Sequence, residues 1–285
     1  MSKASEVAGL GPATKARDAA GRVVLARLAD ARRLEPKLGR RAAAAPVHDL
    51  RVALRRLRAA LQLFGAPRSL DRAVKRTQDA LGRVRDRQLR LSWLASLDLA
   101  GTKVLVRQER AALAGDRARL RRALEVWESR TRREVARAAQ SLAPRGRLAG
   151  ARVRKRVVRR LGKIEETLPS VLAGAPPQAA HRLRIALKKL RYEAEIASLA
   201  APDLYGPLVE AATPLQALLG DLHDADLRAQ WASERAAREE PPEVAALLAV
   251  VDRAGEERER AAASTIARLA AVTDERLFAR LARLV

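Results

Sequence analysis

Two stretches of the chain carry the same pattern, and that pattern decides the fold. The first reads VHDLRVALRRLR (residues 47–58) and the second reads AHRLRIALKKLR (residues 180–191), so that His48 recurs as His181. On a helix with about 3.6 residues per turn, the leucines of each stretch fall on one side, and the histidine and basic residues fall on the adjoining side. Each stretch therefore predicts a helix that buries leucines and presents a row of cations beside them.

The repetition extends beyond these two stretches. RVV at residues 22–24 recurs at residues 156–158, ahead of the second stretch. Behind the stretches, a block with the same spacing occurs twice, as Gln78, Leu81, Gly82, Asp86 and Trp93 and again as Gln216, Leu219, Gly220, Asp224 and Trp231. Three blocks in one order indicate an internal duplication. We expect a flexible tail over residues 1–14, a first repeat over 15–145 and a second repeat over 146–285.

The composition favours helix throughout, because Ala, Leu, Arg and Glu dominate and no long alternation of apolar and polar residues suggests a sheet. Glycines and prolines mark the ends of the expected helices. The sequence predicts an all-α fold of two pseudo-symmetric helical bundles with long helices. The expected helices are 15–34, 46–64, 68–84, 86–98 and 103–140 in the first repeat, and 151–172, 178–200, 203–219, 221–239 and 242–284 in the second.

Charge is the strongest functional signal. The chain has 57 Lys and Arg against 33 Asp and Glu, a net charge of +24. Self-repulsion of this size destabilises a compact chain, so the balance points to a polyanionic partner. A GC-rich genome would explain why only 9 of the 57 basic residues are lysine, but it would not explain the excess of positive charge. Arginine also suits phosphate, whose oxygens its planar fork binds in pairs.

The candidate binding residues are the cations of three predicted helices. Each histidine in the two repeated stretches could be a ligand or a member of a symmetric core pair, and the sequence leaves these alternatives evenly balanced. The expected anion-binding residues are His48, Arg51, Arg55, Arg56 and Arg58 on the first helix, His181, Arg184, Lys188, Lys189 and Arg191 on its repeat, and Arg152, Arg156, Arg159 and Lys163 on the helix from residue 151.

Motifs for catalysis are missing from the sequence. It contains no cysteine, no serine in a G-x-S-x-G setting and no P-loop, so we expect neither an enzyme nor a bound cofactor. His223 and Asp224 could suggest a metal pair, but only the aspartate recurs, as Asp86. We interpret Asp86 and Asp224 as helix caps or arginine partners rather than metal ligands. A phosphohydrolase built around them is the weaker alternative.

Nucleic acid is the main competing partner. A basic face binds a duplex backbone without sequence preference. Seven aromatic residues in the whole chain are too few for a platform that stacks single-stranded bases. Weak, non-specific binding to nucleic acid therefore remains the alternative. The sequence shows no signal peptide and no apolar run long enough to span a membrane, so we expect a cytoplasmic protein without membrane contact and leave its oligomeric state open.

The two stretches have a family resemblance. The pattern His-x-x-Arg-h-x-h-[Arg/Lys]-[Arg/Lys]-Leu-Arg, with Leu-Gly-x-h-x-Asp further on and h an apolar residue, resembles the conserved-histidine α-helical domain (CHAD) family. The resemblance covers residue 15 to the C-terminus, and both copies match. It implies that the basic helix faces bind inorganic polyphosphate, at polyphosphate granules in some family members. Carried over by position, it implicates the same His, Arg and Lys residues of both stretches.

Overall fold

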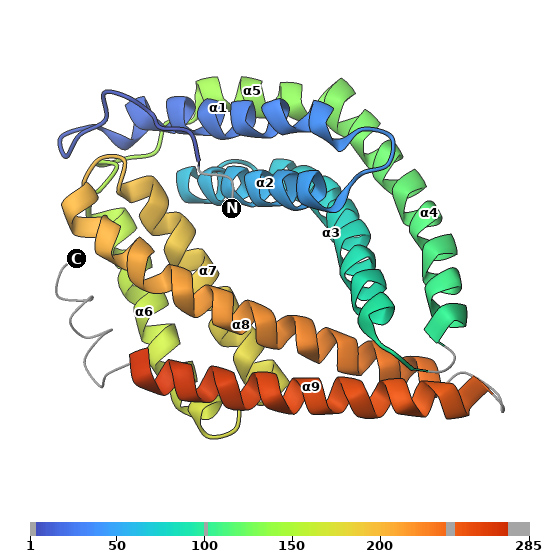
Figure 1. The fold of residues 1–285 in the computed structure, drawn as a ribbon. Coiled ribbons are helices and arrows are strands. Elements are labelled where there is room, and N and C mark those ends of the chain that lie inside the picture. Colours follow the sequence, from blue (N-terminus) through green and yellow to red (C-terminus); the bar gives the residue numbers. More distant parts are fainter. Residues whose placement is uncertain (1–3, 100–101, 238–242, 273–285) are drawn as a thin grey trace. The chain divides into compact units, whose positions relative to one another are not determined.

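The computed structural model describes residues 4–99, 102–237 and 243–272, and this part of the chain is helical with no β-strand (Figure 1). The predicted all-α fold is therefore confirmed. The helices are α1 (Ala16–Leu34), η1 (Glu35–Leu38), α2 (Ala44–Phe64), α3 (Arg68–Ser96), α4 (Thr102–Val126), the π-helical segment η2 (Trp127–Thr131), α5 (Arg132–Ser141), α6 (Ala151–Leu172), α7 (Pro177–Ala197), α8 (Pro202–Ala236) and α9 (Glu243–Val272).

The chain divides into two compact units. Unit 1 comprises residues 1–96, 105–153 and 199–201, and unit 2 comprises 97–104, 154–198 and 202–285. The main division follows Val153, eight residues beyond the expected end of the first repeat at 145. The duplication itself stays a prediction.

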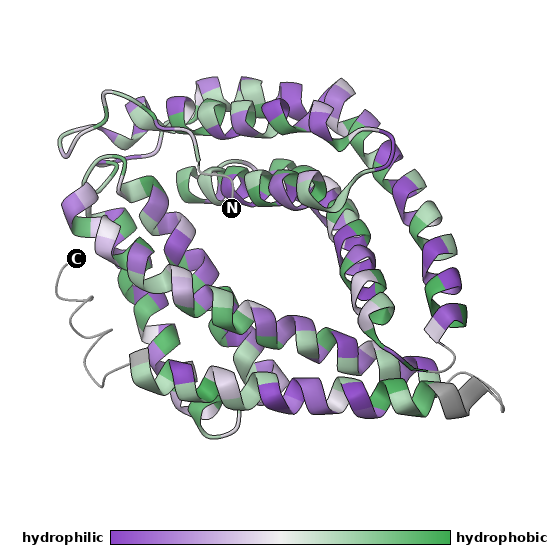
Figure 2. Ribbon diagram, viewed as in Figure 1, coloured by the Kyte–Doolittle hydropathy of each residue, from purple (hydrophilic) through white to green (hydrophobic). Residues whose placement is uncertain are grey.

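Unit 1 is organised around α2. In it, α1 packs against α2 and α5, and α2 packs against α3 (Figure 1). Hydrophilic and hydrophobic residues alternate along the helices in Figure 2, as expected for helices with one buried face. The leucine stripe predicted for residues 47–61 is confirmed, because its members are fully buried: Leu50, Leu54, Leu57 and Leu61.

Residues 4–14, in the segment expected to be a flexible tail, form no helix but contact α1. The Ser5 hydroxyl and the Ser5 backbone N–H both donate to the Asp30 carboxylate, and Arg27 donates to the same carboxylate and to the Ser5 carbonyl. Asp30 and Arg27 are both buried. The hydrogen bonds to Asp30 outweigh the effect of its burial, so its pKa lies below the ordinary value.

A tryptophan joins the π-helical segment to the end of α1. The Trp127 side chain is fully buried, and its indole Nε1 donates to Glu35 Oε1 at 2.6 Å. The second oxygen of Glu35 accepts a hydrogen bond from Arg132 at 3.0 Å. This carboxylate therefore holds η2 and the start of α5 against η1.

Unit 2 contains α7, α8, α9 and most of α6. In it, α8 packs against both α7 and α9. The leucine stripe of the second stretch is confirmed as well, since Leu183, Leu187 and Leu190 are each 1% exposed. Arg258 on α9 donates to Asp226 on α8 at 3.0 Å, which adds a polar contact to this packing.

Two predicted helix boundaries are wrong. Residues 68–84 and 86–98 were expected as separate helices but form the single helix α3, and residues 203–219 and 221–239 likewise share α8. Gly82 and Gly220, which lie at or near the expected boundaries, are inside these helices. A glycine in a helix interior costs only about 1 kcal/mol, which tertiary packing outweighs. The predicted helix over 103–140 is interrupted by η2, and the predicted ends at 239 and 284 lie outside the described residues.

One glycine permits a close helix contact. A Cβ added at Gly21 on α1 would lie 2.8 Å from the backbone oxygen of Ala139 on α5. We expect Gly21→Ala to lower the free energy of unfolding by roughly 1–3 kcal/mol, because the two backbones must separate. Chemical denaturation measures this change.

Gly115→Ala is the matched control, since nothing lies within 4 Å of its added Cβ. This control should stabilise the chain by up to about 1 kcal/mol, and equal effects of both substitutions would contradict the prediction.

Candidate anion-binding site

The histidine of the first stretch lies among arginines from two helices. Burial lowers the pKa of His48 below its ordinary value of 6.5, and the positive charges of Arg85, Arg55 and Arg51 lower it further, against the opposing charge of Asp49. Arg51 and Arg55 come from α2, whereas Arg85 comes from α3. We call these four residues, His48, Arg51, Arg55 and Arg85, the first basic cluster.

An aspartate accompanies this cluster. Asp86 lies within α3, so it is not a helix cap. Burial raises its pKa, while the charges of Arg51, Arg90, Arg55 and Arg85 act in the opposite direction. The alternative interpretation of Asp86 as an arginine partner therefore agrees with its surroundings. Two carboxylates, Asp49 and Asp86, lie among a larger number of guanidinium groups here, so positive charge is in excess.

The second stretch forms a comparable cluster in unit 2. The ring of His181 on α7 lies 5.5 Å from the ring of His223 on α8, centroid to centroid, with a tilt of 46°. Burial lowers the pKa of His181, and the charges of Arg184 and Lys188 lower it further. We call His181, His223, Arg184 and Lys188 the second basic cluster. Both histidines of the repeated stretches thus favour the neutral form in the unliganded protein.

A third group of cations surrounds a buried glutamate. Glu193 on α7 is 4% exposed and accepts hydrogen bonds from Arg156 and Arg160 of α6, at 2.7 and 3.4 Å. Burial lowers the pKa of Lys189 on α7, as do the charges of Arg160, Lys163 and Arg156, while Glu193 acts in the opposite direction. One buried carboxylate thus supports four cations at this position.

The row of cations predicted on the helix from residue 151 is not one group. Arg156 and Lys163 lie near Glu193 in unit 2, whereas Arg152 belongs to unit 1, where its guanidinium lies beside Gly65 at the end of α2. Arg159 is exposed on α6. Arg160, which the prediction omitted, contacts Glu193 instead.

Like Arg156, the predicted binding residues Arg58 and Arg191 have intramolecular partners. Arg58 donates to Asp71 at 2.8 and 3.1 Å and to Gln78 at 3.1 Å. Arg191 is 3% exposed and donates to Gln216 at 2.8 Å and to Glu195 at 2.5 Å. The same arginine–glutamine contact therefore occurs in both units. Arg56, Arg184 and Lys188 are half-buried, and Lys189 is exposed.

Arg85 and the His181–His223 contact were missed as binding features, although the repeat contains a signal for them. Arg85 and His223 occupy equivalent places, each one residue before the repeated aspartate. Each lies beside the histidine of its own unit.

Among the described residues, no group of three or more His, Cys, Asp or Glu side chains could hold a metal ion. None of the helices in this part of the chain combines the length and the apolar character that a membrane span needs.

The fold and these clusters define an all-α protein that concentrates basic residues on paired helices. The sequence profile of the CHAD domain matches residues 22–233, and the chain belongs to this family. A comparison with curated proteins found no match.

Two solved structures share the fold. The CHAD domain from the plant Ricinus communis is 20% identical, with a TM-score of 0.76, over 95% of this chain and 96% of that one. PptA from Streptomyces chartreusis is 19% identical, with a TM-score of 0.63, over 90% of this chain and 99% of that one. CHAD domains are associated with polyphosphate-related proteins.

Proposed function

We propose that this chain binds inorganic polyphosphate through the two basic clusters and the cations around Glu193, without catalysing its turnover. The observation that carries the proposal is the place of the two histidines. In each unit a histidine with a lowered pKa lies beside cations of a repeated helix and beside a residue of the next helix, Arg85 or His223. A polyanion would relieve the repulsion within each cluster.

Other arginines of unit 1 make a useful comparison. Arg87 donates to Asp116 and Glu109, both at 2.7 Å, and Arg27 donates to Asp30 at 3.0 Å. Such pairs neutralise charge inside the unit. The helix α2 itself carries four arginines and His48 against one acid, Asp49, although Arg58 is paired with Asp71 of α3. This imbalance favours a ligand with many closely spaced negative charges.

Titration with long-chain polyphosphate in ~150 mM salt, with duplex DNA as competitor, tests the proposal. We expect tight binding that excess DNA does not displace, and a steep loss of affinity with added salt. Easy displacement by DNA would favour the nucleic-acid alternative. Release of phosphate in the presence of divalent metal would instead favour a hydrolase, with Asp86 and Asp224 as its candidates. If the proposal is right, the protein should also co-purify with polyphosphate granules of the cytoplasm.

Affinity for polyphosphate should depend on pH. His48 and His181 have pKa values below 6.5 in the unliganded protein, so they are neutral at pH 7. A nearby phosphate favours the protonated imidazole, so binding takes up protons. We expect affinity to rise as the pH falls through about 6.5, until both histidines are protonated even without ligand. Titrations at several pH values measure this dependence.

The matched variant is His48→Gln with His181→Gln. Glutamine keeps a hydrogen-bond donor but does not titrate. The variant should retain the affinity of the original chain at pH 8 and lose most of its increase in acid. An unchanged increase in the variant would assign the proton uptake to other groups and remove the histidines from the site.

A further inference from the structure

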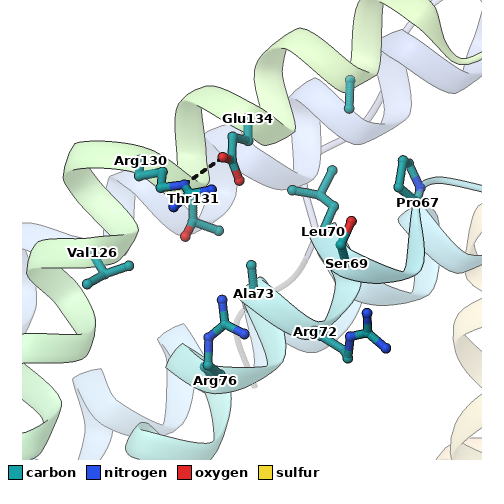
Figure 3. Close-up of a pocket in the computed structure, with 11 residues that line it drawn as sticks. Pro67, Ser69, Leu70, Arg72, Ala73, Arg76, Val126, Arg130, Thr131 and Glu134 are labelled. Carbon is teal, nitrogen blue, oxygen red and sulfur yellow. Dashed lines mark hydrogen bonds and ion pairs between the residues drawn. The ribbon is translucent and has the colours of Figure 1, made fainter.

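A pocket of about 440 Å³ that is open to solvent lies in unit 1, and no residue of the two basic clusters lines it. The first turns of α3 form one wall, and η2 with α5 forms the other (Figure 3). Three arginines line it, Arg72 and Arg76 from α3 and Arg130 from η2. Figure 3 shows Arg76 extending from α3 toward the segment that carries Arg130 and Thr131.

The charge of the cavity is positive but limited. Glu134 on α5 accepts a hydrogen bond from Arg130 Nε at 2.7 Å, and the Arg130 side chain is 76% exposed to solvent. Three arginines and one glutamate leave a net charge of +2. A phosphate monoester carries about −1.5 to −2 at pH 7. The charges of the cavity and of one such group therefore match.

The remaining walls are apolar. Leu70 and Ala73 of α3, Val126 at the end of α4 and Ala138 of α5 contribute aliphatic surface. Small-molecule sites usually have volumes of about 300–1,000 Å³ and combine apolar walls with a few polar groups. The pocket is wider than a bare phosphate, and its aliphatic side chains would contact an apolar body attached to that phosphate.

The backbone beside the cavity is unusual. The π-helical segment Trp127–Thr131 interrupts a run of helix from 102 to 141, and π-helical turns are rare and frequent at functional sites. Arg130 and Thr131 belong to this segment. The wider turn thus supplies part of the cavity wall.

We propose that this cavity binds a small organic phosphate, a monoester with an apolar body, independently of polyphosphate. Arg76 and Arg130 would bind the phosphate oxygens, and the aliphatic wall would contact the organic part. A long polyphosphate chain has no apolar part to contact that wall, so the wall should favour the organic monoester over polyphosphate.

Calorimetric titration with AMP tests the proposal, since AMP is a phosphate monoester whose adenine ring can pack its apolar faces against aliphatic side chains. We expect saturable one-to-one binding with a Kd below ~1 mM. Inorganic phosphate should bind at least about tenfold more weakly, because it cannot use the aliphatic wall. No binding of AMP at this concentration would overturn the proposal.

Variants locate the binding. Arg76→Gln should weaken AMP binding at least about tenfold by removing a charged donor, and Ala138→Leu should do so by filling the cavity without changing charge. Arg83→Gln removes an exposed arginine of α3 outside the cavity, and it should change the Kd less than twofold. Equal losses in Arg76→Gln and Arg83→Gln would mean diffuse attraction and would contradict the proposal.

A variant of the first basic cluster separates the two proposals. Arg51→Ala with Arg55→Ala should leave AMP binding intact while it weakens polyphosphate binding. If this variant lost AMP binding while Arg76→Gln retained it, AMP would bind in the first basic cluster. That result would overturn the proposal of a separate site. In the same series, the affinity of Arg76→Gln for polyphosphate shows whether polyphosphate binding is independent of this pocket.

Discussion

Replacing Arg51, Arg55, Arg184 and Lys188 together by alanine should weaken polyphosphate binding at least about a hundredfold and leave the helix content unchanged. In the proposed complex, each of these side chains donates a charge-assisted hydrogen bond to the ligand. Such a hydrogen bond contributes about 1.5–3 kcal/mol when it is removed alone, and the contributions of neighbouring residues do not simply add. The variant also removes four charges from the clusters, so the slope of log affinity against log salt should become shallower. Titrations at three salt concentrations measure both quantities, with circular dichroism to check the fold.

The control is a second quadruple variant that loses the same net charge on a different helix, α4. Arg107, Arg110, Arg121 and Arg122 are all exposed on α4, and their replacement by alanine should weaken binding only a few-fold through the general field of the protein. If the two quadruple variants lost affinity equally, polyphosphate would be held by overall charge, and the two basic clusters would not be its site.

Arg191→Ala should be the most destabilising of the substitutions in the repeated stretches, by about 3–5 kcal/mol. Arg191 is buried, and its removal leaves Glu195 and Gln216 without their donor. Lys188→Ala, one turn earlier on α7, should change the free energy of unfolding by less than about 0.5 kcal/mol. Urea denaturation of both variants gives the comparison directly.

Arg191→Lys refines this prediction. Lysine keeps the charge but cannot donate to two partners through a planar fork, so it should recover only part of the lost stability. The opposite result for Arg191→Ala, normal stability with lost polyphosphate binding, would make Arg191 a ligand contact, as the family pattern implies, rather than a residue that positions α7 against α8.

The helices with buried leucines could be predicted because the information is local. Leu50 and Leu54 recur at helical spacing, and that spacing alone fixes a face. The continuity of α3 across Gly82 could not be predicted, because it depends on packing between helices rather than on propensity. A glycine therefore marks the end of a helix only where no neighbouring helix packs against that turn and stabilises it.

The candidate site was partly predictable for a related reason. The row of cations on α2 follows from spacing, but the contribution of Arg85 depends on how α3 is rotated about its axis. Rotation likewise decides that Arg160 contacts Glu193 while Arg159 is exposed on α6. The equivalence of Arg58 and Arg191 is visible in the sequence, whereas their hydrogen bonds to Gln78 and Gln216 appear only when two helices are packed.

The burial of Trp127 gives the protein an internal spectroscopic reporter. Its indole is shielded from solvent and bonded to Glu35, so its emission should be blue-shifted in the native state and move to the red when η2 separates from η1. Trp93 also belongs to unit 1, whereas Trp231 belongs to unit 2. Variants that keep only Trp127 or only Trp231 would therefore follow each unit separately during denaturation. Coincident transitions would indicate that the units unfold as one cooperative system, and separate transitions would give each its own stability.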